Sequence, residues 1–163
     1  MAQSNTTKIK INNLIILSIL FFIFLDNAQA INLEERDYFA SIKASKANVR
    51  SGPGTNYNIK FTYHMKNIPI RITGRYDNWN EIEDFEGEKG WISQNLLSRK
   101  RTAMIKTKQS VINIYLTATT KSRIVMQAEN KVISKLIGCK KSWCKIEIEG
   151  KKGWVEQKYI WGI

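Results

Sequence analysis

The side chains best suited to chemistry in this 163-residue chain are two cysteines. Cys139 and Cys144 flank four residues between two predicted strands, and their parity places them close together across a hairpin, within bridging distance. A disulfide that closes so short a loop stabilises a small fold by about 2 kcal/mol. The alternative is a redox pair, but that function favours the C-x-x-C spacing beside the start of a helix. We therefore expect a structural disulfide.

Catalytic side chains are sparse in the rest of the chain. His64 is the only histidine, so a histidine cluster for zinc is excluded and one imidazole alone could serve as a base. Glu81 and Glu83 share a strand face, but this spacing is common on exposed strands. The segment 51–54 (SGPG) precedes no predicted helix and so does not form a phosphate-binding loop. We expect no enzyme, no cofactor and no metal site.

One motif occurs twice and organises the chain. The segment 79–92 (WNEIEDFEGEKGWI) returns as 143–155 (WCKIEIEGKKGWV), with one residue deleted. Upstream, 47–49 (ANV) is echoed by 112–114 (INI), and the offset between the copies drifts from 65 to 63 residues. Such a drift is expected when loops lose single residues. The chain is therefore predicted to contain two tandem copies of one small domain.

The local patterns in each copy indicate strands. Polar and apolar residues alternate at period two, and Gly87 and Gly150 mark hairpin turns that need a positive φ. Pro69 predicts an edge strand or the start of a strand. After residue 30 we expect no helix beyond a single turn following each Gly-Trp pair. Short strands in copies of about 60 residues predict an all-β fold made of two small barrels.

Particular segments resemble a known family. Residues 48–55 (NVRSGPGT) resemble the N-V-R-x-G-P-[GS]-T signature that opens bacterial SH3 domains, and 90–97 (GWISQNLL) is similar to the strand and turn that close an SH3 barrel. More closely, the chain resembles the exported SH3-like proteins of alphaproteobacteria, a domain of unknown function. The segments that carry this likeness are FASIK at 39–43, LSRKRTA at 97–103, Cys139 with Trp143-Cys144, and IWG at 160–162.

The resemblance implies two tandem SH3-like barrels, at 31–98 and 99–163, with residues 31–40 as an arm against the first. The second copy departs from the pattern, because Tyr115–Ala118 replaces the Arg-x-Gly-Pro element and Asn130 stands where a turn glycine is usual. Its first loop should therefore differ in shape, and a site in that loop of the first copy need not exist in the second.

Tryptophans are the candidate binding surfaces. Trp79 and Trp143 lie on the polar faces of their strands, and in SH3 barrels this position borders the peptide groove. The alternative is that each ring packs on the neighbouring barrel or on the arm. Trp91 and Trp154 follow a glycine and are expected in the core or at the barrel seam, where Trp91 would still border the groove. The groove expected in the first copy consists of Asn48, Arg50, Tyr57, Trp79 and Trp91.

Proline-rich ligands are not expected in this groove. SH3 domains that bind them carry a proline after the Gly-aromatic pair, and here Ser93 and Glu156 take that position.

The net positive charge of residues 31–163 lies entirely in the second copy. Residues 31–98 carry nine Lys or Arg against nine Asp or Glu, whereas 99–163 carry fifteen against four, a net charge of +11. This asymmetry indicates an anionic partner such as an envelope polymer, although a lysine-rich coding style explains it equally well. In the second copy the expected ligand contact is Trp143, with an anionic contact at Lys140, Lys141, Lys151 and Lys152.

The first thirty residues are typical of a signal peptide. Lys8 and Lys10 precede the apolar run 14–25, which spans only about 18 Å as a helix, and 28–30 (AQA) suits a signal peptidase. Cleavage after Ala30 is expected, with an uncleaved anchor as the alternative. No later stretch is long or apolar enough to cross a membrane.

These features together predict a periplasmic or secreted, non-enzymatic binding module. Its expected partner is cell-wall peptide or an envelope protein. The alternative is a structural or adaptor subunit of an envelope complex, or the partner of a wall hydrolase. Nucleic acid is not an expected partner, because the predicted compartment does not contain it.

Overall fold

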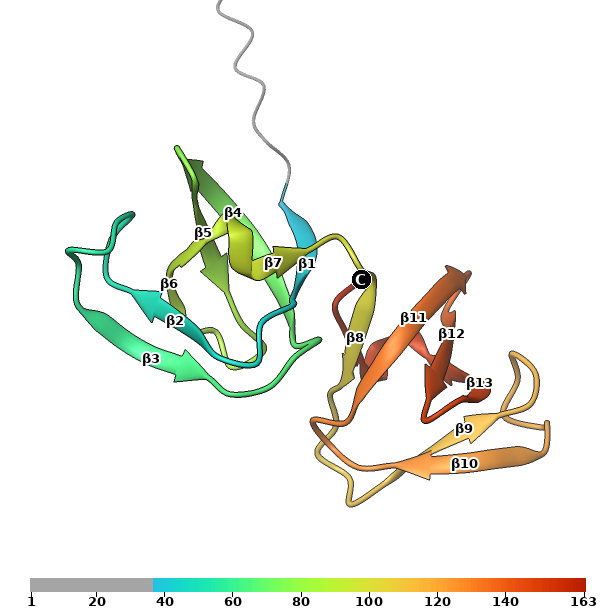
Figure 1. Ribbon diagram of the computed structural model, residues 1–163. Coiled ribbons are helices and arrows are strands. Elements are labelled where there is room, and N and C mark those ends of the chain that lie inside the picture. Colours follow the sequence, from blue (N-terminus) through green and yellow to red (C-terminus); the bar gives the residue numbers. More distant parts are fainter. Residues whose placement is uncertain (1–36) are drawn as a thin grey trace, which may run out of the picture. The chain divides into compact units, whose positions relative to one another are not determined.

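Two seven-stranded antiparallel sheets follow one another along the chain in the computed structural model (Figure 1). The structure describes residues 37–163, so the expected signal peptide, its cleavage site and most of the N-terminal arm lie outside the described residues. Within residues 37–163 the regular structure consists of strands and two single turns of 3₁₀ helix. The all-β prediction is therefore confirmed, and so is the expected limit on helix. No helix among these residues is long and apolar enough to cross a membrane.

The first sheet has the strand order β3-β2-β6-β5-β4-β1-β7. Its elements are β1 (Tyr38–Ile42), β2 (Ala47–Arg50), β3 (Ile59–Tyr63), β4 (Pro69–Tyr76), β5 (Trp79–Glu83), β6 (Lys89–Ser93), η1 (Gln94–Leu96) and β7 (Leu97–Ser98). The end of the predicted arm is thus part of the barrel, since β1 pairs with both β4 and β7. Pro69 begins β4, as predicted.

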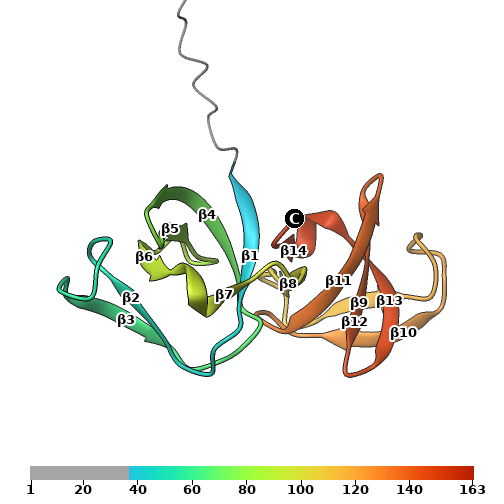
Figure 2. The ribbon, with the colours of Figure 1, turned by 45° about the horizontal axis from the view of Figure 1, so that its top comes forward.

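The second sheet repeats this order as β10-β9-β13-β12-β11-β8-β14. Its elements are β8 (Thr102–Ile105), β9 (Ile112–Tyr115), β10 (Ile124–Ala128), β11 (Ile133–Lys140), β12 (Trp143–Ile148), β13 (Lys151–Glu156), η2 (Gln157–Tyr159) and β14 (Ile160–Trp161). Each strand of the first sheet therefore has a counterpart seven strands later, which confirms the predicted tandem repeat. Figure 2 shows each sheet curling around its own interior.

The alternating pattern of each strand gives each barrel a separate apolar core. Side chains at every second position of β2, β5 and β6 are fully buried in the first barrel, among them Val49, Ile82 and Ile92. The same positions of β9, β12 and β13 supply Ile114, Ile146 and Val155 to the second core. The intervening residues of these strands face outward, because successive side chains point to opposite faces of a sheet.

The two copies also share their turns. Gly87 and Gly150 adopt φ values of 88° and 79°, which a side chain would disfavour, so both hairpins need the predicted glycines. The amide of Gln94 donates to the carbonyl oxygen of Asn78, and the amide of Gln157 donates in the same way to Ser142. These bonds attach each 3₁₀ turn to the preceding hairpin.

Candidate ligand groove in the first barrel

A groove of about 470 Å³ on the first barrel brings together Asn48, Arg50 and Trp79. Asn48 and Arg50 face outward from β2 because Ala47 and Val49 are buried in the core. Trp79 faces outward from β5 because Asn80 and Ile82 point inward. Strand β6 lies between β2 and β5, so the groove runs across the outer ends of three neighbouring strands.

The remaining lining residues come from β6, from η1 and from both ends of the β2 region. They are Lys46, Thr55, Ser93, Asn95 and Leu96. The groove therefore combines an indole ring with amide, hydroxyl and cationic groups, and none of its lining residues is acidic. Such a surface suits an extended polar chain with carbonyl or carboxylate acceptors.

Arg50 also organises the loop beside the groove. Its Nη1 donates to the carbonyl oxygens of Thr55 at 3.0 Å and of Tyr57 at 2.7 Å. The amide of Ser51 donates to Asn58 and closes the same loop at its base. The Arg50 guanidinium therefore holds the loop in place, and the Arg50 side chain also lines the groove.

Tyr57 packs on the glycines of this loop and does not line the groove. A Cβ atom at Gly52 would lie 2.4 Å from two ring carbons of Tyr57, and one at Gly54 would lie 3.3 Å from the ring. The first glycine of the G-P-G segment thus has a steric cause, since a side chain at Gly52 would overlap the Tyr57 ring. The expected groove role of Tyr57 is replaced by a contribution through its carbonyl oxygen, which Arg50 binds.

Asn48 presents donors to the groove. Its Oδ1 accepts a hydrogen bond from Thr62 Oγ1 at 2.9 Å on the neighbouring strand. This bond orients the side-chain amide, so that its nitrogen is the atom that can donate to a ligand.

Trp91 lies at the barrel seam, which is one of the two positions expected for it from the sequence. Its backbone pairs with Arg50, and Trp154 pairs in the same way with Tyr115. Neither ring belongs to a core cluster, because Ile92 and Val155 occupy the inward positions. The core alternative is therefore wrong, and Trp91 is not among the groove-lining residues.

The second barrel presents a different surface at the corresponding place. Tyr115 occupies the position of Arg50, and its ring packs edge-to-face against Trp143 with centroids 5.7 Å apart. The loop that follows is closed by the amide of Leu116 donating to Arg123 and by Ser122 Oγ accepting from the amide of Thr117. The predicted difference between the two first loops is present in the structure.

The four lysines expected to form one anionic contact lie at opposite ends of β12. Lys140 pairs with Trp143 at one end of this strand, and Lys151 pairs with Ile148 at the other end. The five residue steps between these ends span roughly 17 Å. Lys152 Nζ also lies 3.8 Å from Glu147 Oε2, so part of its charge is already paired. One compact patch of all four lysines is therefore not formed.

The predicted disulfide is present between Cys139 and Cys144. The two residues are direct cross-strand partners in the β11–β12 hairpin, with Cα atoms 4.0 Å apart. Cys144 is fully buried in the second core.

Comparison with known proteins gives the class of this fold. The chain is an all-β protein of two tandem small barrels, and the model of the family described as bacterial SH3 domain matches residues 43–99 and 108–162. The chain therefore belongs to the bacterial SH3 domain family. Each match covers most of one barrel.

One curated relative is the Bacillus subtilis (strain 168) protein YrvJ, whose assigned name is that of an N-acetylmuramoyl-L-alanine amidase. It is 28% identical over 130 residues, which make up 74% of this chain but 25% of the relative. This chain thus spans a quarter of the length of the relative that it matches.

Solved structures to which the chain is similar include NlpC1 from Trichomonas vaginalis and an NlpC/P60 family protein from Bacillus cereus ATCC 10987. Both similarities cover 76% of this chain, and they cover 45% and 55% of the respective structures. Sequence identities are 13% and 9%, and both TM-scores are 0.34.

Proposed function

We propose that this chain is a non-enzymatic binding module of the cell envelope, whose first barrel holds cell-wall peptide in the groove beside Trp79. The observation that carries the proposal is the groove itself, in which Asn48, Arg50 and Trp79 converge from two strands. Membership of the bacterial SH3 domain family and the amidase name of one relative support a role at the wall.

An extracytoplasmic location fits the chemistry of the chain. Disulfides persist in oxidising compartments, and both cysteines are joined in one. The signal peptide predicted at residues 1–30 would deliver the chain to such a compartment.

The groove would bind an extended peptide through three complementary contacts. The Trp79 ring offers a flat face against which peptide planes and apolar side chains can pack. The Asn48 amide nitrogen donates to peptide carbonyls, and Lys46 and Arg50 attract carboxylates at the same place. The function proposed for this groove is binding without cleavage.

The test compares Trp79→Ala with Trp143→Ala in a pull-down on purified wall fragments. The two variants remove the same ring from corresponding strands of the two barrels. Because an aromatic anchor contributes about 1.4 kcal/mol or more, Trp79→Ala should weaken retention roughly tenfold or more. Trp143→Ala should have a smaller effect, because the Tyr115 ring already packs against that tryptophan.

The melting curve and NMR spectrum of each variant serve as folding controls. Equal retention of wild type and a folded Trp79→Ala variant would remove the groove from the proposal. Equal losses in both variants would show that the binding surface is not particular to the first barrel.

A second candidate function is that of an adaptor for a separate wall hydrolase. The observation that favours it is the relative named as an amidase, in which the matched region makes up only 25% of the sequence. A stoichiometric protein partner in envelope extracts, together with no affinity for purified wall, would support the adaptor function over wall binding.

A further inference from the structure

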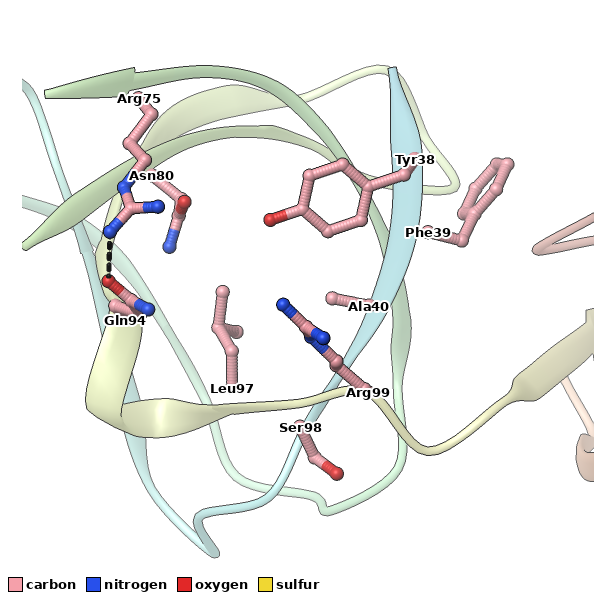
Figure 3. Close-up of a pocket in the computed structure, with 9 residues that line it drawn as sticks. All are labelled: Tyr38, Phe39, Ala40, Arg75, Asn80, Gln94, Leu97, Ser98 and Arg99. Atoms are coloured by element: carbon pink, nitrogen blue, oxygen red, sulfur yellow. Dashed lines mark hydrogen bonds between the residues drawn. The ribbon is translucent and has the colours of Figure 1, made fainter. Parts of the chain in front are cut away.

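A second cavity, of about 560 Å³, opens in the first barrel beside Gln94 of η1 (Figure 3). Gln94 of η1 lines this cavity, whereas its neighbour Asn95 lines the groove. Tyr38, Ala40 and Leu97 form an apolar wall on β1 and β7. The two cavities share no lining residue, so this one is a separate site.

The opposite side of the cavity is cationic and rich in amides. Arg75, Asn80 and Gln94 lie together there, and Arg99 extends its guanidinium toward the same space from the end of β7 (Figure 3). The two arginines are the only charged residues in the lining. Within residues 37–163 neither arginine forms an ion pair, so both positive charges face the cavity without a carboxylate partner.

Arg75 is held in position before any ligand arrives. Its Nη2 donates to Gln94 Oε1 at 2.9 Å, and its Nε donates to the carbonyl oxygen of Asp77 at 3.3 Å. These bonds leave the Nη1 side of the fork available. A guanidinium fixed in this way loses little conformational entropy when it binds a planar oxyanion.

Asn80 adds a buried polar group to the cavity. The residue is only 3% exposed and points inward from β5. Ile82, two residues further along the same strand face, belongs to the core. A buried amide is normally matched by hydrogen-bonding groups. Here its side chain faces the cavity together with the Tyr38 hydroxyl (Figure 3).

The second barrel keeps a glutamine at the position of Gln94, as Gln157 of η2, but differs at the positions of Arg75, Asn80 and Arg99. Arg75 and Asn80 are cross-strand partners in the β4–β5 hairpin. They lie three and eight residues after Ile72, where the register of the two strands shifts. In the β11–β12 hairpin the same two positions, after the same shift at Leu136, are the disulfide-bonded Cys139 and Cys144.

The two barrels also differ at the residue that follows β7 and its counterpart β14. Arg99 follows β7 directly, and Gly162 follows β14. One barrel thus carries two guanidiniums and an amide where the other carries a disulfide and a glycine. A scaffold requirement would act on both barrels alike, whereas a ligand site needs only one.

We infer that this cavity binds the C-terminal carboxylate of a short peptide. The two guanidiniums would hold the carboxylate, because planar forks match its two oxygens. The amides of Asn80 and Gln94 can both donate and accept, as a peptide backbone requires. The apolar wall of Ala40 and Leu97 would receive the last side chain of the peptide, and a bare inorganic ion would leave that wall unused.

The test is an NMR titration of the isotope-labelled chain with N-acetyl-Ala-Ala and with its C-terminal amide. The free acid should shift the signals of Asn80, Gln94 and Tyr38 and leave the Trp79 indole unchanged. The amide form should bind at least roughly tenfold more weakly, because the charge-assisted hydrogen bonds are lost. Equal binding of acid and amide would overturn the inference without any variant.

Arg75→Gln and Arg99→Gln should each weaken binding of the acid by roughly tenfold. Arg123→Gln is the matched control, since it makes the same change at an exposed arginine of the second barrel and should leave binding unaltered. Loss of binding in the control as well would reduce the effect to overall charge and contradict the site.

Two further ligands separate the sources of an anionic group. Inorganic phosphate tests for a phosphate site, and galacturonic acid tests for the carboxylate of a sugar. If either binds as tightly as N-acetyl-Ala-Ala at the same residues, the assignment to a peptide is wrong. These titrations need no wall material, so their failure is distinguishable from failure of the groove proposal.

Discussion

Glu83 accepts a short hydrogen bond from Arg71 across the β4–β5 hairpin, with Arg71 Nη2 and Glu83 Oε2 2.7 Å apart. Lys89 Nζ lies 3.6 Å from the same carboxylate oxygen on the other neighbouring strand. The hydrogen bond from Arg71 is the main cause that lowers the pKa of Glu83 below its ordinary value, with the charges of Arg71 and Lys89 acting in the same direction. The outward-facing glutamate therefore links three strands of the first barrel.

A lowered pKa makes the contribution of Glu83 depend on pH. The ionised carboxylate stabilises the fold above its ordinary pKa, near pH 4.5, and this stabilisation is lost as pH falls through the lower pKa of the folded state. We expect Glu83→Gln to cost about 0.5–1 kcal/mol at pH 6 and progressively less toward pH 3. Urea unfolding at each pH, followed by the NMR signals of Ile82 and Ile92, measures the difference.

Arg71→Gln completes a double-mutant cycle for this prediction. The two single changes should be non-additive at pH 6 and should become additive at low pH. A coupling energy that does not change with pH would assign the stabilisation to packing instead.

Asp84 and Tyr63 form a second interaction at the residue scale that sequence patterns do not indicate. Tyr63 donates to Asp84 Oδ2 at 2.8 Å, and Asp84 Oδ1 accepts from the amides of Glu86 and Glu88 at 2.9 Å. Burial, followed by this hydrogen bond, raises the pKa of Tyr63 above its ordinary value. The aspartate thereby fixes the β5–β6 turn. Its tyrosine partner lies 21 residues earlier in the sequence.

At the scale of elements, one hairpin has been used in two ways. In the first barrel the β4–β5 hairpin places Arg75 and Asn80 beside an open cavity, whereas the β11–β12 hairpin joins the same positions by a disulfide. Cys144 belongs to the second core, so the disulfide connects this core to the exposed end of the hairpin.

Reduction of the disulfide should destabilise the second barrel alone. The closed loop is short, so the chain-entropy contribution is about 2 kcal/mol. Amide hydrogen exchange measured with and without dithiothreitol should show lower protection at Ile146 and Val155. The matched amides of Ile82 and Ile92 in the first barrel should keep their protection, and equal loss in both barrels would contradict a local role.

At the scale of the whole molecule, the two barrels have the same strand order but different net charges. The two barrels share topology and core positions, yet residues 99–163 carry fifteen Lys or Arg against four Asp or Glu, and residues 31–98 are balanced. The lysines are spread along β11, β12 and β13, where Lys135 and Lys152 both lie within 4.0 Å of Glu147.

Retention on wall material should therefore fall with salt if an anionic polymer contacts the second barrel. The Debye length shortens from about 10 Å at 0.1 M to about 3 Å at 1 M ionic strength, so long-range attraction to the lysines is screened. Among variants, Lys140→Gln with Lys141→Gln should lower retention more than Lys151→Gln with Lys152→Gln. The reason is that Lys152 is already paired with Glu147. Retention that does not change between these salt concentrations would exclude the electrostatic contact.

Local features of this protein could be predicted from its sequence because their causes lie within a few residues. Alternating polarity defines the strands, Gly87 and Gly150 define hairpins, and Cys139 and Cys144 meet because one short turn separates them. The repeated motif then predicts the same fold for both copies. Asn48, Arg50 and Trp79 were predicted together through the resemblance, and the structure places them in one groove.

Other features depended on contacts between distant strands. Tyr57 packs on Gly52 and not in the groove because the loop folds back on itself, and the four lysines are separated because they lie at opposite ends of β12. The cavity beside η1 joins Tyr38 to Asn80 and Arg99, which alternation alone would scatter over unrelated strands. The alternation of polar and apolar side chains along a strand can be read from adjacent residues. A cavity forms only after long-range pairing has determined which strand ends meet. The sequence by itself thus determined two SH3-like barrels and a disulfide, and the tertiary structure decided where the first barrel could hold a ligand.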